Sequence, residues 1–396
     1  MVFFYAQNQK GGTKSMKFTA NRSEMQPIIK RCCLVIGRQF LAKEKVCVLM
    51  EADEDHNHVQ FTAMGNECVL QARLNCYVEH SGKAMMIGSV LQSMLELFRE
   101  EVTTVETDDT TISVRNAKAG YSFALVDTKK YPVPEPCMPE TMCEADGFCD
   151  ISFKVLFSVA KGNEQNLRVL NCIRVTVHDG QWSATSCDSY RLTMVSKDTT
   201  QTQPLDMLLA VDAMKTVLHV FNGIPHFKVG VSNGNAVFCG PGMVLRARLN
   251  EEQYVNIQPL IDHFHMVHEV QVDGGVLLDT LKRISAGSTT NAKLLLLPVD
   301  DRTMRLQFIS NANSTVSGQI EMDCVVKTPL PKDGFCYNYI YLKEAASLMQ
   351  GNDIAVQFDK TGAMMLRADN ELHLLLPTRQ SKVEEKPKTK RTRKAA

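Results

Sequence analysis

The stretch KGGTKS, from Lys10 to Ser15, carries residues whose types and spacing could bind nucleotide phosphates. It follows an apolar run, as does the loop that wraps phosphates with backbone N–H groups and a lysine. That loop keeps a Gly directly before its Lys, whereas Thr13 precedes Lys14 here, and the following MKFTA alternates like a strand. We therefore expect residues 1–15 to be an N-terminal extension. A nucleotide hydrolase that uses this loop is the first alternative.

Two other groups of residues have the chemistry of metal ligands. The first group is Cys137, Cys143 and Cys149, in which five residues separate each cysteine from the next. Paired zinc ligands favour a separation of two to four residues. The second group is His263, His265 and His268 in DHFHMVHE. These histidines lie at an apparent domain junction, and no Cys or carboxylate pair accompanies them in a known ligand pattern. We predict linker cysteines and solvated or capping histidines. The remaining cysteines lie mostly in apolar stretches, as reduced thiols do. We expect no metal, no cofactor and no catalytic residue.

The balanced net charge conceals an uneven distribution. The chain has 44 Lys and Arg against 44 Asp and Glu. The C-terminal SKVEEKPKTKRTRKAA holds seven basic and two acidic residues, and residues 1–15 add two lysines, which leaves 35 basic and 42 acidic residues between them. The body is therefore acidic and both ends are basic. No run of about 18 apolar residues and no signal-peptide pattern occurs, so we expect a cytoplasmic protein.

The elements that must position any functional residue occur in one order three times. The predicted first helices are SEMQPIIKRCCLVI from Ser23, SFKVLFSVAKG from Ser152 and VLLDTLKRISAG from Val276, with apolar residues three and four apart. Ser23 and Ser152 are candidate N-caps. The predicted second helices are KAMMIGSVLQSMLELF, VDAMKTVLHVF and YIYLKEAASLMQG.

Alternating strands surround these helices. The ladders are VCVLMEAD with HVQFTAMGN, LRVLNCIRVTV with WSATSCDS, and KLLLLPVD with MRLQFISNAN. Closing pairs are TISVRNAKAGYSFALVD, NAVFCGPGMVLRARL and AMMLRADNELHLLLP. The pattern recurs about every 120 residues. We predict three α+β domains at 16–135, 146–262 and 266–380, joined by linkers at 131–147 and 258–268, with a disordered basic tail at 381–396.

This order and spacing resembles the bacterial sliding clamp, the beta subunit of DNA polymerase III. MKFT from Met16 looks like the family's opening strand, and Tyr131-Pro132 stands where a Phe-Pro pair ends the first domain. SCDSYRL from Ser186 is similar to the family's ATDGHRL. HLLLPTRQ from His373 is similar to its terminal YVVMPMRL.

The resemblance implies a non-catalytic processivity factor. Three tandem DNA-clamp domains would place antiparallel sheets outside and two helices per domain on the inner face. Two chains would close head to tail as a homodimeric ring around double-stranded DNA, with phosphate contacts independent of base sequence. A solvated helix face is the alternative role for the candidate DNA-binding residues: Lys30, Arg31, Arg38, Lys83 on the second helix, Lys154, Lys161, Lys215, Lys282 and Arg283.

The resemblance also implies a cleft between domains two and three that binds short linear peptides of the polymerase catalytic subunit, the clamp loader and repair proteins. Plain strand core is the alternative role for its leucines. The implied walls are Leu170, Cys187, Ser189, Tyr190, Arg191, Leu192, Val255, Leu260, Asn338, Tyr341, Met364, Leu374, Leu375, Leu376, Pro377, Thr378 and Arg379.

Three departures bear on the peptide that such a cleft prefers. Ser189 stands where the family has a Gly, Val255 lies in the altered segment that replaces Phe-Pro-Asp-Tyr, and Thr378 replaces an apolar residue. The predicted dimer edge is the closing strand of domain one, with Tyr121, Phe123 and Leu125.

The tail segment KPKTKRTRK is too polar to fold alone. It either contacts phosphates or keeps the chain in solution. A non-ring DNA-binding protein acting through this tail is the second alternative function.

Overall fold

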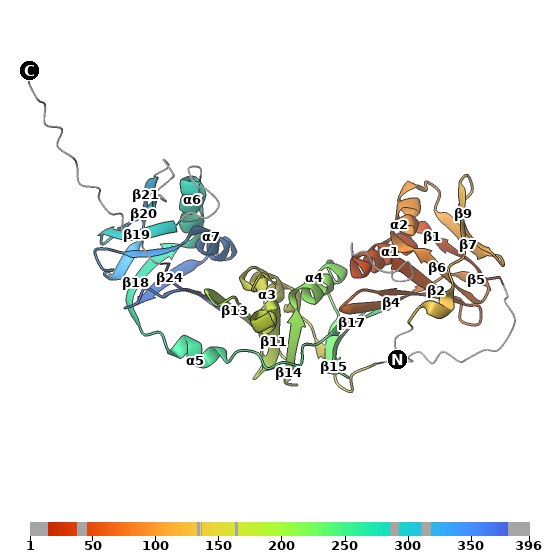
Figure 1. Ribbon diagram of the computed structural model, residues 1–396, viewed down its shortest axis with the longest axis horizontal. Helices are drawn as coiled ribbons and strands as arrows, with labels where there is room; N and C mark the ends of the chain where they lie inside the picture. Colours follow the sequence, from red (N-terminus) through yellow and green to blue (C-terminus); the bar gives the residue numbers. More distant parts are fainter. Residues whose placement is uncertain are drawn as a thin grey trace, which may run out of the picture. The chain divides into compact units, whose positions relative to one another are not determined.

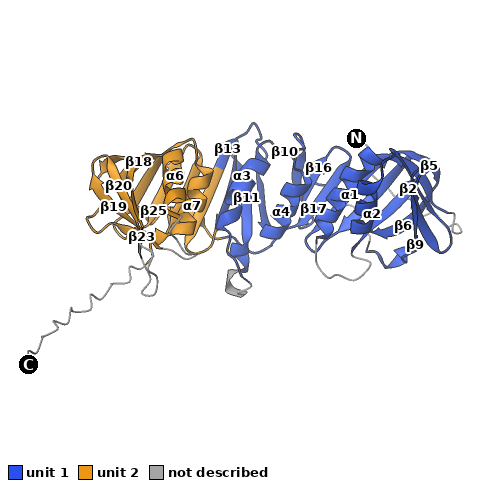
Figure 2. Ribbon diagram, turned by 90° about the horizontal axis from the view of Figure 1, so that it is seen from above, with its two compact units in different colours: residues 1–186, 196–254 blue, residues 187–195, 255–396 orange. Residues whose placement is uncertain are grey.

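The computed structural model divides the chain into two compact units. It describes residues 15–37, 46–132, 135, 137–162, 165–285, 293–309 and 318–378. Unit 1 comprises residues 1–186 and 196–254, and unit 2 comprises residues 187–195 and 255–396 (Figure 2). The loop at Lys10, apart from Ser15, and the whole basic tail lie outside the described residues. Within the described ranges, no helix is long and apolar enough to cross a membrane.

The first repeat follows the predicted order of elements. Its elements are β1 (Lys17–Asn21), α1 (Arg22–Ile36), β2 (Cys47–Asp53), β3 (His58–Met64), β4 (Cys68–Asn75), β5 (Tyr77–His80), β6 (Gly82–Ile87), α2 (Gly88–Leu97), β7 (Val102–Thr107), β8 (Thr111–Arg115) and β9 (Gly120–Ala124). The strands β5-β1-β7-β8-β9 form one antiparallel sheet. The 3₁₀ helix η2 (Thr128–Lys130) leads to Tyr131, which is buried and donates a hydrogen bond from its hydroxyl to the Thr62 carbonyl at 3.0 Å.

The second repeat joins the first through a shared sheet. Its elements are β10 (Cys143–Glu144), α3 (Phe148–Val155), η3 (Leu156–Ser158), η4 (Gln165–Asn171), β11 (Cys172–His178), β12 (Gln181–Cys187), β13 (Arg191–Asp198), β14 (Leu205–Ala210), α4 (Val211–Val220), β15 (Lys228–Ser232), β16 (Asn235–Gly240) and β17 (Met243–Arg248). Because β4 pairs with β17, one eight-stranded sheet runs β10-β15-β16-β17-β4-β3-β2-β6 within unit 1.

The helices of unit 1 pack as neighbours on one side of its sheets. Helix α1 contacts α2 and α4, and α4 contacts α3, so the four lie side by side (Figures 1 and 2). The buried face of α1 is Met25, Ile29, Cys32, Val35 and Ile36, which recur three and four residues apart. A Cβ on Gly65 would lie 2.2 Å from the Val35 carbonyl oxygen, so only glycine lets the turn after β3 approach α1 this closely.

The third repeat lies in unit 2, after α5 (Ile257–Asp262). Its elements are β18 (Met266–Asp273), α6 (Gly274–Ile284), β19 (Lys293–Asp300), β20 (Thr303–Ile309), β21 (Gln319–Asp323), β22 (Val325–Thr328), β23 (Phe335–Asn338), α7 (Tyr339–Leu348), β24 (Asp353–Asp359), β25 (Met364–Ala368) and β26 (Glu371–Leu375). Two antiparallel arrays, β13-β26-β25-β24-β18-β22 and β21-β20-β19-β23, enclose an apolar core with α6 and α7.

The structure corrects several sequence predictions of element ends. Neither predicted N-cap is one, because α1 begins at Arg22 after Asn21 and α3 begins at Phe148 after Gly147, which leaves Ser23 and Ser152 inside helices. The second helix of the first repeat begins at Gly88, so the residues before it form β6 instead. The predicted strand LRVLNCIRVTV begins only at Cys172, since the residues before it form η4. The second linker is shorter than predicted, since β18 already begins at Met266.

Candidate functional site

The residues after β12 form a tight turn that fixes the start of β13. Ser189 has φ 72°, a left-handed conformation that favours glycine, the residue that the family resemblance leads us to expect here. The Asp188 carboxylate accepts hydrogen bonds from the backbone N–H groups of Tyr190, at 3.1 Å, and Arg191, at 3.0 Å. This local bonding turns the two neighbouring side chains in different directions. Tyr190 is 63% exposed, whereas Arg191 is only 5% exposed.

The buried guanidinium of Arg191 is held from three sides. Its Nε donates to Asp188 Oδ2 at 2.9 Å, and Nη1 donates to the Glu344 carboxylate on α7. Its central carbon lies 4.0 Å from the centre of the Tyr341 ring. Burial, together with the negative charge of Asp188, raises the pKa of Tyr341, which keeps the phenol neutral. A buried charge with these partners is well compensated and holds its position.

The C-terminal segment lies beside this turn. β13 pairs with β26, with Arg191 opposite Leu375 and Leu192 opposite Leu374. Beyond the strand, the Leu376 N–H donates to the Tyr190 carbonyl at 2.8 Å, and the Thr378 N–H donates to the Cys336 carbonyl at 2.7 Å. Residues 187–192 and 373–378, which belong to two sequence motifs far apart along the chain, therefore meet in unit 2.

The predicted cleft residues divide by exposure. Tyr190, Val255 and Leu260 are exposed, and the half-buried members are Asn338, Tyr341, Leu376, Pro377 and Thr378. The Asn338 side chain caps α7 by accepting from the Ile340 N–H at 2.9 Å. The buried members pack as strand core: Cys187, Leu192, Met364, Leu374 and Leu375. Leu170 is buried in unit 1 at η4, and Arg379 lies outside the described residues.

The predicted DNA-binding residues lie mostly on helices, with one correction. Lys83 lies on strand β6, not on a helix, and its ammonium pairs with the Glu51 carboxylate at 2.5 Å. Lys30 and Arg31 are on α1, Lys154 on α3, Lys215 on α4, and Lys282 with Arg283 on α6, whereas Lys161 is exposed after η3 and Arg38 lies outside the described residues.

Several of these basic groups already have a partner. Arg31 Nε donates to the Val220 carbonyl at 3.1 Å, Lys215 lies 3.6 Å from Asp212, and Arg283 lies 2.8 Å from Asp279. Among the described residues, Lys30 and Lys282 are exposed and make no ion pair.

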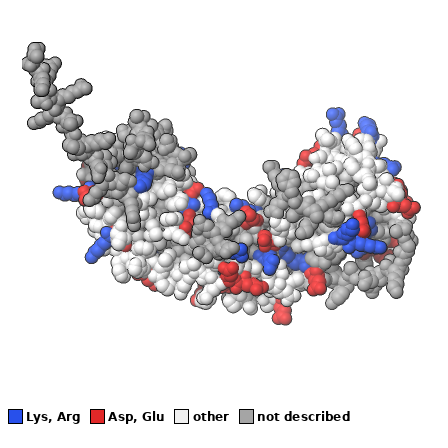
Figure 3. Space-filling model, viewed as in Figure 1, with Lys and Arg blue, Asp and Glu red and all other residues white. Residues whose placement is uncertain are grey.

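The helices carry a small excess of positive charge. Helices α1 to α4, α6 and α7 hold eight basic and six acidic residues: Arg22, Lys30, Arg31, Lys154, Lys215, Lys282, Arg283 and Lys343 against Glu24, Glu96, Asp150, Asp212, Asp279 and Glu344. Figure 3 shows basic and acidic side chains intermixed along unit 1. The charge of these helices is thus of opposite sign to that of the chain body.

The predicted dimer strand is the last strand of its sheet. β9 pairs only with β8 among the described strands and carries Tyr121, which is 44% exposed and stacks on Phe98 with ring centres 6.1 Å apart. Phe123 is half-buried on the same strand. Leu125 follows the strand and donates its N–H to the Thr110 carbonyl at 2.9 Å.

Among the described residues, neither the cysteines Cys137, Cys143 and Cys149 nor the histidines His263, His265 and His268 cluster closely enough to hold a metal ion. Burial raises the pKa of the Cys143 thiol, and burial near Asp150 raises that of Cys149 to about 11, so both stay protonated. His263 ends α5, and His268 Nδ1 is hydrogen-bonded to the Pro329 carbonyl.

A cluster that the sequence analysis missed is Asp53, His56 and His58, whose ligand atoms lie within 4.8 Å of one another. The sequence feature that indicates this cluster is the hexapeptide DEDHNH, in which carboxylate and imidazole side chains lie within a few residues of one another.

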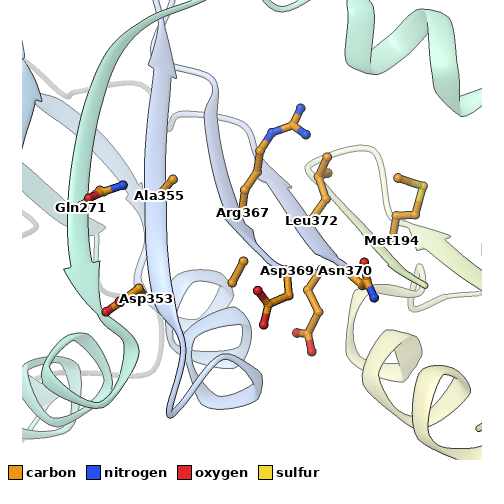
Figure 4. Close-up of a pocket in the computed structure, with 10 residues that line it drawn as sticks. Met194, Gln271, Asp353, Ala355, Arg367, Asp369, Asn370 and Leu372 are labelled. Atoms are coloured by element: carbon orange, nitrogen blue, oxygen red, sulfur yellow. The ribbon is translucent and has the colours of Figure 1, made fainter. Parts of the chain in front are cut away.

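A pocket of about 290 Å³ opens beside β13, β18 and β24 to β26. Its polar groups come from different strands and do not converge, as the separated side chains of Arg367 and Asp353 show (Figure 4). It lies at the opposite end of the β13–β26 pair from Tyr190, because Val195 is opposite Glu371 there. The pocket therefore offers no focused binding chemistry.

Comparison with known proteins identifies solved structures that share the fold of this chain. No protein-family model matches the sequence, and no curated protein matches it. The chain is similar to the DNA polymerase sliding clamp of Bacillus subtilis, with a TM-score of 0.84 and 14% identity over 93% of this chain and 100% of that chain. It is similar to the DNA polymerase III beta subunit of Thermotoga maritima, with a TM-score of 0.81 and 17% identity over 92% and 100%.

A sliding clamp of Bartonella birtlesii bound to griselimycin matches with a TM-score of 0.81 and 15% identity over 93% and 100%. The chain therefore has the fold of the DNA polymerase III beta subunits, an α+β clamp fold, at low sequence identity.

Proposed function

We propose that the chain is a sliding clamp, a non-catalytic processivity factor that encircles double-stranded DNA and tethers a replicative polymerase. Three clamp domains, at residues 16–135, 146–262 and 266–380, would form each protomer, and two protomers would close head to tail as a ring. The observation that carries this proposal is the agreement in fold with solved sliding clamps over nearly the whole of both chains.

The charge distribution supports the DNA part of the proposal. A ring that slides needs weak phosphate contacts without base readout, since strong contacts would hold it in place. The helices carry a small positive excess on a body that is otherwise acidic. The exposed ammonium groups of Lys30 and Lys282 suit transient contacts, and we propose that the other basic residues predicted from the sequence, Lys83 among them, add further phosphate contacts.

The turn at Tyr190 supports the peptide part. Tyr190 exposes an aromatic ring next to a fixed backbone, and half-buried Leu376 and Pro377 follow the adjacent strand. An aromatic ring beside apolar side chains suits the Leu and Phe anchors of an extended peptide. We propose that the clamp loader, repair proteins and the polymerase bind here through short linear peptides.

The free strand edges support ring closure. β9 ends the sheet of the first repeat, and β21 ends the array β21-β20-β19-β23 in unit 2. The hairpin before β9 carries Arg115 and Lys118, and β21 carries Glu321 and Asp323, but Lys118 already pairs with Glu100 at 3.4 Å and Glu321 with Arg305 at 2.7 Å. We propose that β9 of one protomer adds to β21 of the other, because each is the last strand of its array among the described strands and two such edges can complete one another's hydrogen bonding.

Light scattering after gel filtration tests the proposal. A head-to-tail ring has a mass of about 89 kDa, twice the 44.3 kDa of one chain. A strict monomer at micromolar concentration would contradict a ring of two chains.

A further inference from the structure

The turn between β2 and β3 gathers three groups that bind metals. Asp53 ends β2 and His58 begins β3, directly opposite one another in the strand pair. His56 lies in the turn between them, and Asn57 at φ 48° closes that turn. One carboxylate oxygen and one ring nitrogen from each histidine lie within 4.8 Å of one another.

Hydrogen bonds within the turn account for the positions of the Asp53 carboxylate and the His56 ring. Asp53 Oδ1 accepts from the N–H groups of Asp55, at 3.0 Å, and His56, at 3.2 Å, which fixes the carboxylate. Asp53 Oδ2 lies 2.8 Å from His56 Nδ1.

His58 is the group that these bonds leave unexplained. It is only 8% exposed, and its Nδ1 is buried and makes no hydrogen bond of normal geometry within the described ranges, although the His56 backbone lies near the ring. Burying a polar nitrogen without a partner is unfavourable, so such an atom calls for a ligand.

We propose that Asp53, His56 and His58 form a binding site for a divalent cation of the zinc class, with water completing the coordination. Two imidazoles and one carboxylate are a donor set typical of Zn²⁺ with an open fourth position. Mg²⁺ and Ca²⁺ prefer oxygen ligands, so this donor set disfavours them.

The site needs only a small contraction to bind zinc. Tetrahedral ligands at about 2.0–2.1 Å from the ion lie about 3.4 Å apart. The His56 side chain is 73% exposed, so little packing opposes a change in its rotamer. Arg73 on β4 places a positive charge near Asp53 and His58, so the ion must bind through strong imidazole bonds rather than through charge alone. A bound ion would tie β2 to β3 at their turn.

Zinc titration of the full reduced chain by calorimetry tests the site. We compare the wild type with His56→Gln, whose exposed position leaves the fold intact, and with Asp53→Asn. We expect the wild type to bind one equivalent that either variant binds at least tenfold more weakly. Cobalt(II) bound at this equivalent should show d–d absorption without a thiolate charge-transfer band, which separates it from binding to cysteine.

His178→Gln is the matched control. His178 Nδ1 lies 2.9 Å from Asp179 Oδ2 at the β11–β12 turn, a similar pair that has no third ligand among the described residues. We expect it to bind zinc as the wild type does. Equal zinc binding by the wild type and His56→Gln, or a cobalt spectrum of thiolate type alone, would overturn the proposal.

Discussion

At the scale of single residues, Tyr190 and Arg191 have different roles although they are neighbours. Successive side chains on a strand point to opposite faces, so the turn and the start of β13 send Tyr190 to solvent and Arg191 into the contact with α7. Sequence resemblance predicted both as cleft walls without distinguishing them. Of the two, Tyr190 is exposed to solvent, whereas Arg191 is buried and fixes the turn that carries Tyr190.

We predict that Tyr190→Ala weakens binding of a polymerase tail peptide containing Leu and Phe by about tenfold, because truncating an exposed aromatic anchor removes its contact area. Fluorescence anisotropy of the labelled peptide measures this. Tyr77→Ala is the control, since Tyr77 on β5 is equally exposed, at 65%, but lies in the first repeat. Equal affinity of wild type and Tyr190→Ala would remove Tyr190 from the site.

At the scale of elements, strand and helix order was predictable, but some ends were not. KAMMIG is a short apolar run, which fits a strand and a helix equally well by periodicity. It forms β6 because its backbone pairs with β2, from Ala84 opposite Met50 to Ile87 opposite Cys47. This pairing moved Lys83 from the predicted helix to a strand. The turn at Gly147, with φ 84°, likewise started α3 before Ser152.

We propose that β9 is the element that decides ring closure. We predict that Tyr121→Asp raises the dimer dissociation constant at least tenfold, because a charge at a paired strand edge must lose its water. Sedimentation velocity over a dilution series measures the change. Tyr77→Asp on β5, the opposite edge of the same sheet, is the control and should dimerise as the wild type does. If both variants dissociate alike, the contact is not specific to β9.

At the scale of the whole molecule, net charge conceals where the charges lie. The helices are slightly basic, whereas acidic groups dominate the rest of the body. Phosphate contact by exposed lysines should then appear in the salt dependence of DNA binding, because each neutralised phosphate releases a counterion.

We predict that the double variant Lys30→Gln with Lys282→Gln lowers the magnitude of the slope of log affinity for duplex DNA against log salt by about 3.6, because a ring of two protomers loses four lysines at about 0.9 per phosphate contact. Anisotropy of a labelled duplex over a salt series measures the slope. The control is the single variant Lys228→Gln. Lys228 lies on a strand and pairs with Glu144 at 2.9 Å, so this variant should keep the slope of the wild type. An unchanged slope in the double variant would place both lysines away from DNA.

The sequence by itself determined the order of elements, its threefold repetition, and the two motifs of the candidate peptide site. The order and its repetition follow from local rules, since apolar spacing selects helix or strand residue by residue, whereas the two motifs came from the resemblance to a known family. Only the tertiary structure decided that β4 pairs with β17, that Arg191 reaches Glu344, and that His58 is buried beside Asp53. Such contacts depend on packing and strand register, which no short window of sequence contains.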